Sequence, residues 1–323
     1  MKTAFSAHRR SQRGAALLTA MIIVTLVATL ASAMYWRQWR SVQIEIAERT
    51  RAQSAWILSG ALDWARLILM EDARTGGADH LSEPWATPLA EARLSTFLAA
   101  DESHVEDAPE AFLAGQIIDA QSRFNLTNLV NEGAPSEEDI NALQRLCELV
   151  NIDSGVASTL TSALRLALPG RSASAPAGDS DAPLLPPTVD ELRWLGVDEA
   201  SSARLAPYVT LLPVRTSINL NTASREVIAA VLNTDIGTAD RLIQVRQRTP
   251  FKQLADVQQH LPPGLVPSES RAGIASSFFE VRGRMRIEQR VVEERSLVQR
   301  QGRRVTTLRR ERTSFTVGSG LTP

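Results

Sequence analysis

The residue types that most often carry catalysis are sparse in this chain. The four histidines are scattered along the sequence: His8 near the N-terminus, then His80, His104 and His260. The sequence contains no Gly-x-Ser-x-Gly turn for a serine nucleophile, no phosphate-binding loop and no His-Glu-x-x-His zinc motif. Because each of those chemistries needs its residues at a fixed spacing, we predict that the protein is not an enzyme.

Acidic residues are dense enough in places to bind a hard cation. Calcium takes several oxygen ligands, usually from loops. The residues that could supply them are Asp101, Glu102, Glu106, Asp107 and Glu110 in one segment, and the separate Asp139, Asp179, Asp181 and Asp190. None of these spacings matches an EF-hand. Calcium is therefore an open expectation, to which the sequence assigns no ligands.

The sequence indicates that the chain itself is cleaved, between Gly14 and Ala15. The fourteen residues that end at Gly14 hold four basic residues and no acidic one, and the next twenty residues, 15–34, carry no charge. A secretory signal peptide places its cleavage site after the apolar core, whereas here the small residue precedes it. This layout resembles the leader of type IV pilins and pseudopilins. It implies cleavage after Gly14 by a prepilin peptidase and methylation of the new N-terminus, Ala15.

One long helix is predicted to follow the cleavage site. Residues 15–36 can span a bilayer core of about 30 Å, and the basic leader holds the N-terminus in the cytoplasm. Everything after about Tyr35 then lies on the far side. Residues 37–72 lack proline, and their apolar residues recur at helical spacing: Ala55, Leu58, Leu62, Ala65 and Leu69. An unbroken helix from Ala15 to Asp72 would be about 85 Å long, a length suited to packing subunits into a filament.

Composition and cysteine use fit an exported protein with a packed core. The net charge is −1 and 44% of the residues are hydrophobic, which argues against wholesale disorder. A helix is predicted after Ser136, with Asp139 where a capping box usually has Glu. Leu143, Cys147 and Val150 mark its inner face, so we expect the single cysteine to pack in the core.

Other segments are predicted from local patterns. Residues 112–128 suggest a short β-hairpin, and residues 169–187 hold five prolines among small residues, as is typical of a flexible linker. Thr188–Glu191 opens another capped helix. Residues 278–315 are rich in β-forming residues.

Several segments resemble the protein K family of type II secretion, whose members are minor pseudopilins. They are Arg13–Leu18, Ile118–Leu126, Ser217–Ala223 and Phe278–Gly283. The resemblance follows nearly the whole chain in order. It implies an α+β fold, in which a long N-terminal helix and a pilin-like antiparallel sheet domain are interrupted by a large all-helical insertion. It also implies a non-enzymatic subunit at the tip of the pseudopilus, which helps to initiate assembly and to export folded proteins across the outer membrane.

The same resemblance implies partners, a location and domain boundaries. The partners are minor pseudopilins I and J, the inner-membrane secretion platform and the bacterial inner membrane, crossed once with the C-terminal domain in the periplasm. One relative of this kind binds calcium. The expected parts are the cleaved leader 1–14, the transmembrane helix 15–36, the soluble helix and first part of the sheet domain 37–125, the helical insertion 126–275, and the C-terminal strands and tail 276–323.

Thr19 bears on the position in the filament. Most pilins and pseudopilins carry Glu at the fifth mature position, where its partner is the N-terminal amine of a neighbouring subunit, and an unpaired carboxylate in a bilayer is costly. Here that position is Thr19. A subunit that starts the filament has no earlier subunit to dock against, so Thr19 favours a tip position.

The competing hypothesis is a membrane-anchored DNA-binding protein of a pilus-linked uptake system. Residues 218–257 resemble helix-hairpin-helix modules, whose Gly-x-Gly hairpin offers N–H groups to a DNA phosphate. Asp235 replaces the first of those glycines, and a second hairpin is missing. Residues 282–312 hold eleven arginines and four glutamates, which favours a solvated strand face with interstrand ion pairs. We therefore expect no nucleic-acid partner.

Overall fold

The computed structural model describes residues 13–94, 110–168, 183–287 and 289–316. The chain divides into two compact units, Met1–Ile57 and Leu58–Pro323. The described part of the first unit is purely helical. The second unit holds the end of that helix, a five-stranded sheet and a helical region.

The described residues form helices and one main antiparallel sheet, which is an α+β fold. The helices are α1 (Arg13–Thr75), α3 (Glu137–Leu149), α4 (Gly155–Ala167), α5 (Glu199–Leu205), α6 (Arg225–Leu232), α7 (Ile236–Arg248) and α8 (Leu254–Gln258), with short 3₁₀ helices η1 (Pro84–Ala86), η2 (Ala120–Ser122), η3 (Leu126–Leu129) and η4 (Val189–Leu195). The main strands are β1 (Leu89–Arg93), β2 (Ala111–Asp119), β9 (Phe278–Ile287), β10 (Arg290–Gln301) and β11 (Arg304–Thr316). The short strands are β3 (Phe124–Asn125), β4 (Val130–Asn131), β5 (Ala134–Pro135), β6 (Val209–Thr210), β7 (Ile218–Asn219) and β8 (Ala272–Gly273).

The first unit contains the apolar part of α1. Residues 15–75 form a helix whose N-terminal part is long and apolar enough to cross a membrane by length and composition. Beyond residue 36, the exposed side chains still include Trp39, Val42, Ile44 and Ile46. These apolar side chains make the helix surface suitable for contacts with other helices.

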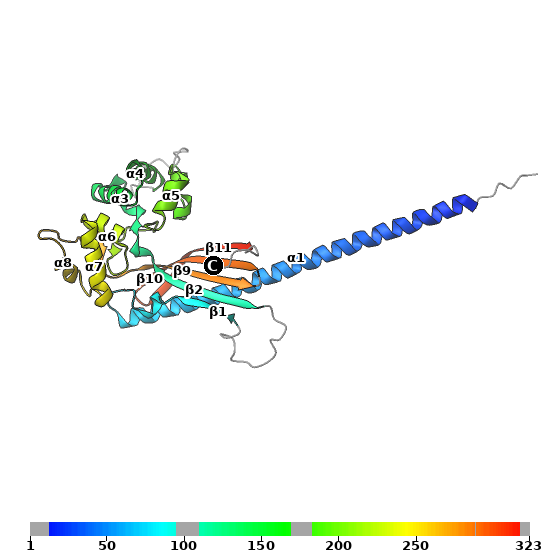
Figure 1. Ribbon diagram of the computed structural model, residues 1–323, viewed down its shortest axis with the longest axis horizontal. Coiled ribbons are helices and arrows are strands. Elements are labelled where there is room, and N and C mark those ends of the chain that lie inside the picture. Colours follow the sequence, from blue (N-terminus) through cyan, green and yellow to red (C-terminus); the bar gives the residue numbers. More distant parts are fainter. Residues whose placement is uncertain (1–12, 95–109, 169–182, 288, 317–323) are drawn as a thin grey trace, which may run out of the picture. The chain divides into compact units, whose positions relative to one another are not determined.

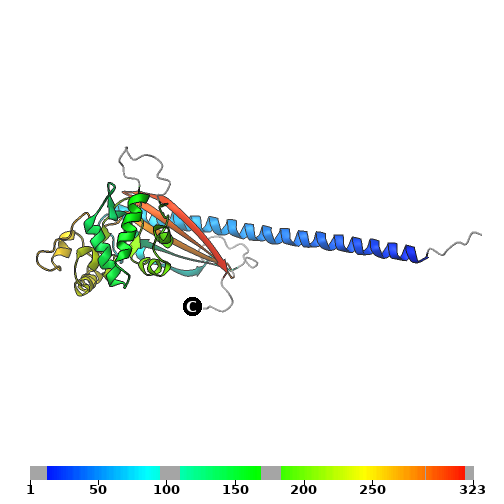
Figure 2. The same cartoon turned by 90° about the horizontal axis from the view of Figure 1, so that it is seen from above.

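The sheet is antiparallel throughout and joins strands from both ends of the second unit. Its order is β1-β2-β9-β10-β11, so β2 pairs with a strand more than 150 residues later in the chain. Figure 1 shows the five strands side by side, and Figure 2 shows the long strands β10 and β11 running alongside each other. Leu62 and Leu69 at the end of α1 pack with Phe279 and Val298 of the sheet.

One glycine is required by this packing. Gly283 of β9 lies beneath Leu58, and a Cβ added at Gly283 would lie 3.0 Å from the Leu58 side chain. Gly115 of β2 is paired directly with Gly283. The absence of a side chain at Gly283 lets the helix approach the sheet closely.

The helical region lies in sequence between β2 and β9 and has its own core. Leu143, Leu146, Leu160 and Ile228 are fully buried there, together with Cys147. A smaller cluster of Ala120, Leu212, Phe278 and Leu297 connects this region to the sheet. The predicted α+β class and the core position of Cys147 are confirmed.

The sequence had suggested an all-helical insertion, but the helical region also contains short strands. Three pairs of two-residue strands occur within it: β3 with β6, β4 with β5, and β7 with β8. These pairs satisfy backbone groups in the buried loops that connect the helices. The predicted all-helical composition was therefore wrong in detail.

The hairpin predicted over 112–128 was also wrong. β2 ends at Asp119 and pairs with β1 and β9, while β3 pairs in parallel with β6. The polar centre of the segment forms η2 and fills a buried junction, so it does not act as a hairpin turn. Strand partners distant in sequence cannot be recognised from local alternation.

Two predicted caps differ from the observed ones. Ser136 does precede α3, but its hydroxyl donates to Asp139 at 2.7 Å and does not cap a backbone N–H. Thr188 similarly bonds Glu191 and begins a seven-residue 3₁₀ helix, η4. In both cases the side chains bond each other, because Asp139 and Glu191 lie within reach of the hydroxyl three residues earlier.

Candidate functional site

The predicted processing site lies at the start of α1. The helix begins at Arg13, so Gly14 and Ala15 are in its first turn. The Thr19 hydroxyl donates a hydrogen bond of 2.8 Å to the carbonyl oxygen of Ala15, one turn earlier. Thr19 thus satisfies its polar group within its own helix and carries no charge that would need a partner.

A buried junction joins the sheet to the helical region around Asp119. Oδ2 of Asp119 accepts hydrogen bonds from Asn219 Nδ2 at 2.9 Å, Thr222 Oγ1 at 2.6 Å and Ser276 Oγ at 2.7 Å. Oδ1 accepts the N–H of Gln121 at 2.8 Å. Burial raises the pKa of Asp119, although all four hydrogen bonds favour the charged form. The Asp119 carboxylate therefore links the end of β2 to two segments far away in sequence, one around Asn219 and one around Ser276.

Gln121 extends the junction from β2 toward the segment before β7. Its side-chain amide donates to the carbonyl oxygen of Ser217 at 2.9 Å, and its oxygen accepts the N–H of Ser277 at 2.6 Å. Asn219 also donates to the carbonyl oxygen of Asp79 at 3.1 Å. The segments Ile118–Leu126 and Ser217–Ala223, which carried the sequence resemblance, therefore meet in one buried polar network.

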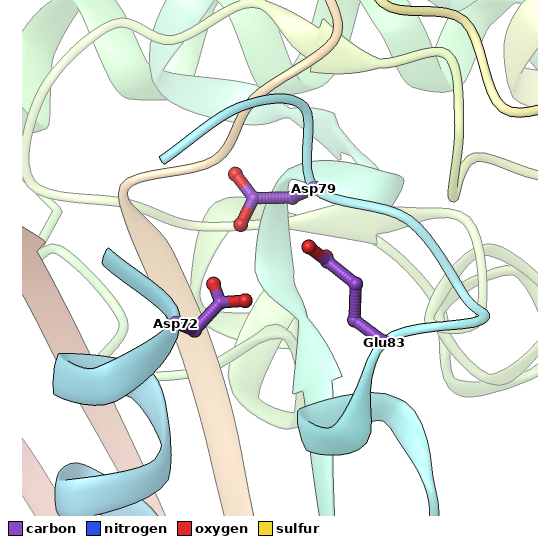
Figure 3. Close-up of side chains that lie close together, drawn as sticks. All are labelled: Asp72, Asp79 and Glu83. Atoms are coloured by element: carbon purple, nitrogen blue, oxygen red, sulfur yellow. The ribbon is translucent and has the colours of Figure 1, made fainter. Parts of the chain in front are cut away.

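An acidic cluster adjoins this network at the end of α1. Asp72 comes from the last turn of α1, and Asp79 and Glu83 come from the loop that follows; Figure 3 shows their carboxylates pointing toward one another. One oxygen of each lies within 4.8 Å of the others. Arg300 of β10 donates hydrogen bonds to Asp72 and to Asp79, each at 2.5 Å. The cluster is linked to Asp119 through Ser276, whose N–H donates to Asp79 at 2.6 Å.

Burial and neighbouring charges shift the pKa values of the residues in the cluster. Burial raises the pKa of Asp79, and burial together with the nearby charge of Glu83 raises the pKa of Asp72. Burial disfavours the charged form of Arg300, but its bonds to Asp79 and Asp72 outweigh that effect and raise its pKa. The guanidinium is therefore held charged between two carboxylates.

The acidic residues named from sequence do not gather into a site within the described residues. Asp101, Glu102, Glu106, Asp107, Asp179 and Asp181 lie outside those residues. Glu110 pairs with Arg93 at 3.0 Å and Asp190 with Arg295 at 3.2 Å. Asp139 accepts from Arg215 at 3.0 Å and lies 3.4 Å from Arg271. These carboxylates form ion pairs with arginines.

Sequence reasoning missed the cluster of Asp72, Asp79 and Glu83. The only sequence cue is their position around Gly76–Gly77, a pair of glycines with φ of +66° and +124° that turns the chain back after α1. Arg300 lies 228 residues after Asp72. That separation hides the arginine from any local pattern.

In the helix-hairpin-helix-like segment, residues 233–235 join the helices α6 and α7. Asp235 is the N-cap of α7, and its carboxylate accepts the N–H of Thr238 at 2.9 Å. Hydrogen bonds from Thr238 lower the pKa of Asp235. The N–H group that such a hairpin would offer to a phosphate is thus bonded by the chain's own carboxylate.

The arginine-rich strands show the predicted interstrand ion pairs. Glu294 of β10 is buried and bonds Arg312 and Arg310 of β11. Arg123 and Arg282 bond Glu280 of β9. Many of these arginines therefore serve the sheet itself.

Comparison with known proteins finds similar sequences and one similar fold. Two family models match, both described as "Type II secretion system (T2SS), protein K", over residues 122–214 and 218–274. Curated relatives with the name "Type II secretion system protein K" include one from Pseudomonas aeruginosa, 28% identical over 84% of this chain and 84% of the relative. Another, from Klebsiella pneumoniae, is 29% identical over 92% of this chain and 94% of the relative.

A solved structure shares the fold. It belongs to the crystal structure of the GspK-GspI-GspJ complex from the enterotoxigenic Escherichia coli type 2 secretion system. The likeness has a TM-score of 0.60 and 19% sequence identity, and it covers 83% of this chain and 98% of the other.

The long apolar helix, the antiparallel sheet and the helical insertion give this chain the fold of that solved structure and resemble the pseudopilin class. Within that class, the chain is similar, by both family models and by the curated relatives, to type II secretion system protein K.

Proposed function

We propose that this protein is a non-enzymatic minor pseudopilin at the tip of the type II secretion pseudopilus. It helps to initiate assembly with minor pseudopilins I and J, and the assembled pseudopilus exports folded proteins across the outer membrane. The observation that carries the proposal is the fold shared, over most of both chains, with a protein whose solved complex is named GspK-GspI-GspJ.

The surface of α1 supports assembly through helix contacts. In the second unit, Trp64 and Leu67 are 53% and 55% exposed on α1, whereas Leu62, Ala65 and Leu69 are buried against the sheet. The apolar residues therefore occupy the outer side of the helix as well as the inner side. An outer face with a large aromatic residue is suited to packing against another subunit's helix.

The N-terminal segment supports the location and the tip position. The apolar part of α1 would anchor the mature protein in the inner membrane, with the basic leader in the cytoplasm and the folded domain in the periplasm. The peptidase would cleave between Gly14 and Ala15. Thr19 has no carboxylate for a neighbour's N-terminal amine, and the helical insertion of residues 126–275 is too bulky to repeat along a filament.

DNA binding receives no support from the hairpin that suggested it. Asp235 places negative charge at the N-terminus of α7, where a phosphate would otherwise bind. Fluorescence anisotropy with a short duplex at about 150 mM salt should show no binding that depends on this hairpin. Micromolar binding that weakens when Ile236 and Gly237 are altered would favour the uptake function.

The test of the proposal is co-elution of residues 37–323 with the soluble domains of pseudopilins I and J in size-exclusion chromatography. The fragment alone should elute as a monomer, and the mixture should elute earlier as one complex. Elution as a homopolymer, or without either partner, would refute the assignment.

Matched tryptophan variants locate the interface. Trp64→Glu should weaken co-elution about tenfold or more, because a charge would be placed in a helix contact. Trp194→Glu is the control, since Trp194 of η4 is similarly exposed at 45% but lies in the helical region. Equal effects of both variants would exclude α1 as the docking face.

A further inference from the structure

The acidic cluster at the end of α1 needs a positive charge. Asp72, Asp79 and Glu83 bring one oxygen each within 4.8 Å of one another, and the side chain of Asp79 is only 3% exposed. Asp72 also lies in the last turn of α1, where the helix dipole disfavours a carboxylate. Calcium is the cation that a relative of this kind would suggest, so its fit can be tested against these side chains.

Arg300 already occupies the cluster. Its two terminal nitrogens bond Asp72 and Asp79 at 2.5 Å each, and Nη2 also donates to the carbonyl oxygen of Ser276 at 2.8 Å. The guanidinium carbon lies 4.8 Å from the centre of the Phe279 ring. The side chain is 12% exposed, so it is fixed by partners on several sides.

The remaining oxygen atoms are too few for calcium. Oδ2 of Asp79 accepts the N–H of Ser276, and Oε2 of Glu83 accepts the N–H of His80 at 2.8 Å and Nε1 of Trp85 at 2.7 Å. Of the six carboxylate oxygens in the cluster, Asp72 Oδ1 and Glu83 Oε1 are the two that accept no hydrogen bond from the described residues. Calcium takes about six to eight oxygen ligands, and the charge of Arg300 repels it. The side chains present do not fit a calcium ion.

We infer that Arg300 is the resident cation of the Asp72–Asp79–Glu83 cluster and fastens the end of α1 to β10 without calcium. The arginine does what a bound metal would do at this place: it balances the carboxylates and joins α1, the loop after it and the sheet. Metal-independent fastening follows, because the cation is covalently part of the chain.

Removal of Arg300 should convert the cluster into a calcium site. Arg300→Met frees Asp72 Oδ2, Asp79 Oδ1 and the Ser276 carbonyl oxygen, in addition to the two oxygens that are already free. A cavity of about 220 Å³ lies beside these residues and is lined partly by Gly76 and Gly77. Five oxygens and water can together supply a calcium coordination shell.

The experiment is thermal unfolding of the full-length protein in detergent, in EGTA and in about 5 mM calcium, which exceeds the dissociation constants of weak extracellular calcium sites. The wild-type Tm should not change through this cluster. The Tm of Arg300→Met should be lower in EGTA and should rise by roughly 3 °C in calcium. Arg123→Met is the matched control, because Arg123 pairs with Glu280 on the sheet and is 16% exposed; its Tm should not respond to calcium.

Two results would overturn the inference. The first is an Arg300→Met protein that folds but shows no response to calcium. The second is a calcium-dependent rise in the wild-type Tm that is lost in Glu83→Gln, which would show that the wild-type cluster binds the metal. The second comparison uses only wild type and an isosteric variant, so it decides the question even if Arg300→Met fails to fold.

Discussion

The side-chain amide nitrogen of Asn219 lies 2.9 Å from Oδ2 of Asp119, one hundred residues earlier in the chain. This bond joins two of the four segments that resemble the protein K family, one at the end of β2 and one at β7. The polar residues of both segments are therefore needed to hold the helical region against the sheet.

Replacement of Asp119 tests the importance of this junction. Asp119→Asn should lower the free energy of unfolding by about 2–4 kcal/mol, because a donor would face the Asn219 amide and the hydroxyls would lose an acceptor. Urea unfolding measures the change. Asp240→Asn is the control, since Asp240 is 41% exposed and its effect should stay within about 0.5 kcal/mol. Similar losses in both variants would contradict the proposed role of the junction.

The ion pair between Arg123 and Glu280 should give a defined pH dependence. Burial raises the pKa of Glu280, but the charges and hydrogen bonds of Arg123 and Arg282 outweigh burial and hold the pKa below its ordinary value of 4.5. The folded state therefore binds this proton less readily than the unfolded state. Its stabilising contribution is present above pH 4.5 and is lost as the pH falls through the lower folded value.

Urea unfolding of wild type and Glu280→Gln measures this contribution. The wild type should be more stable by about 1–3 kcal/mol at pH 7, and the difference should shrink at about pH 3. A difference that stays constant over this range would show that Glu280 does not titrate between the two states.

Cys147 should be unreactive while the protein is folded. Burial, followed by the charges of Asp153 and Glu148, raises the pKa of its thiol to about 11. At pH 8, the reaction with a disulfide reagent should be about a hundredfold slower than that of a free thiol, because the thiolate is the nucleophile. The same protein unfolded in urea is the control and should react fully. Reaction of the folded protein at the rate of glutathione would contradict the buried position.

Processing should occur between Gly14 and Ala15. Mass spectrometry of the native protein should find Ala15 as the N-terminus, with one added methyl group. Gly14→Val should retain the leader, because a branched side chain would clash in the peptidase active site, whereas Gly60→Ala, in open space on the same helix, should be processed normally. An intact Met1 in the wild type, or cleavage after Met34, would refute this prediction.

Sequence periodicity correctly predicted the elements that can be recognised from residues close together in the chain. The long helix follows from the charge-free run and from the spacing of Leu58, Leu62 and Leu69, which are buried as expected. The core position of Cys147 follows from the same spacing rule. The β-rich C-terminal segment became β9, β10 and β11.

The remaining features depend on residues that are far apart in sequence. The strand β2 was mistaken for half of a hairpin because its partner β9 lies beyond the helical region. The acidic cluster could not be predicted, because its cation, Arg300, is supplied by β10. Asp119 lies in a segment that resembles the protein K family. Its structural role could not be predicted, because Asn219, Thr222 and Ser276, which bond its carboxylate, are far away in sequence.

The position of the protein in the pseudopilus is the most direct test of its function as a tip subunit. An epitope inserted at Gly264, an exposed glycine with φ of +87° and open space around it, would permit immunogold labelling of pseudopili extended by overproduction of the major pseudopilin. The same epitope on the major pseudopilin should label the whole length. A subunit at the tip should place gold at one end of each filament; label along the filaments, or none on them, would contradict the tip position.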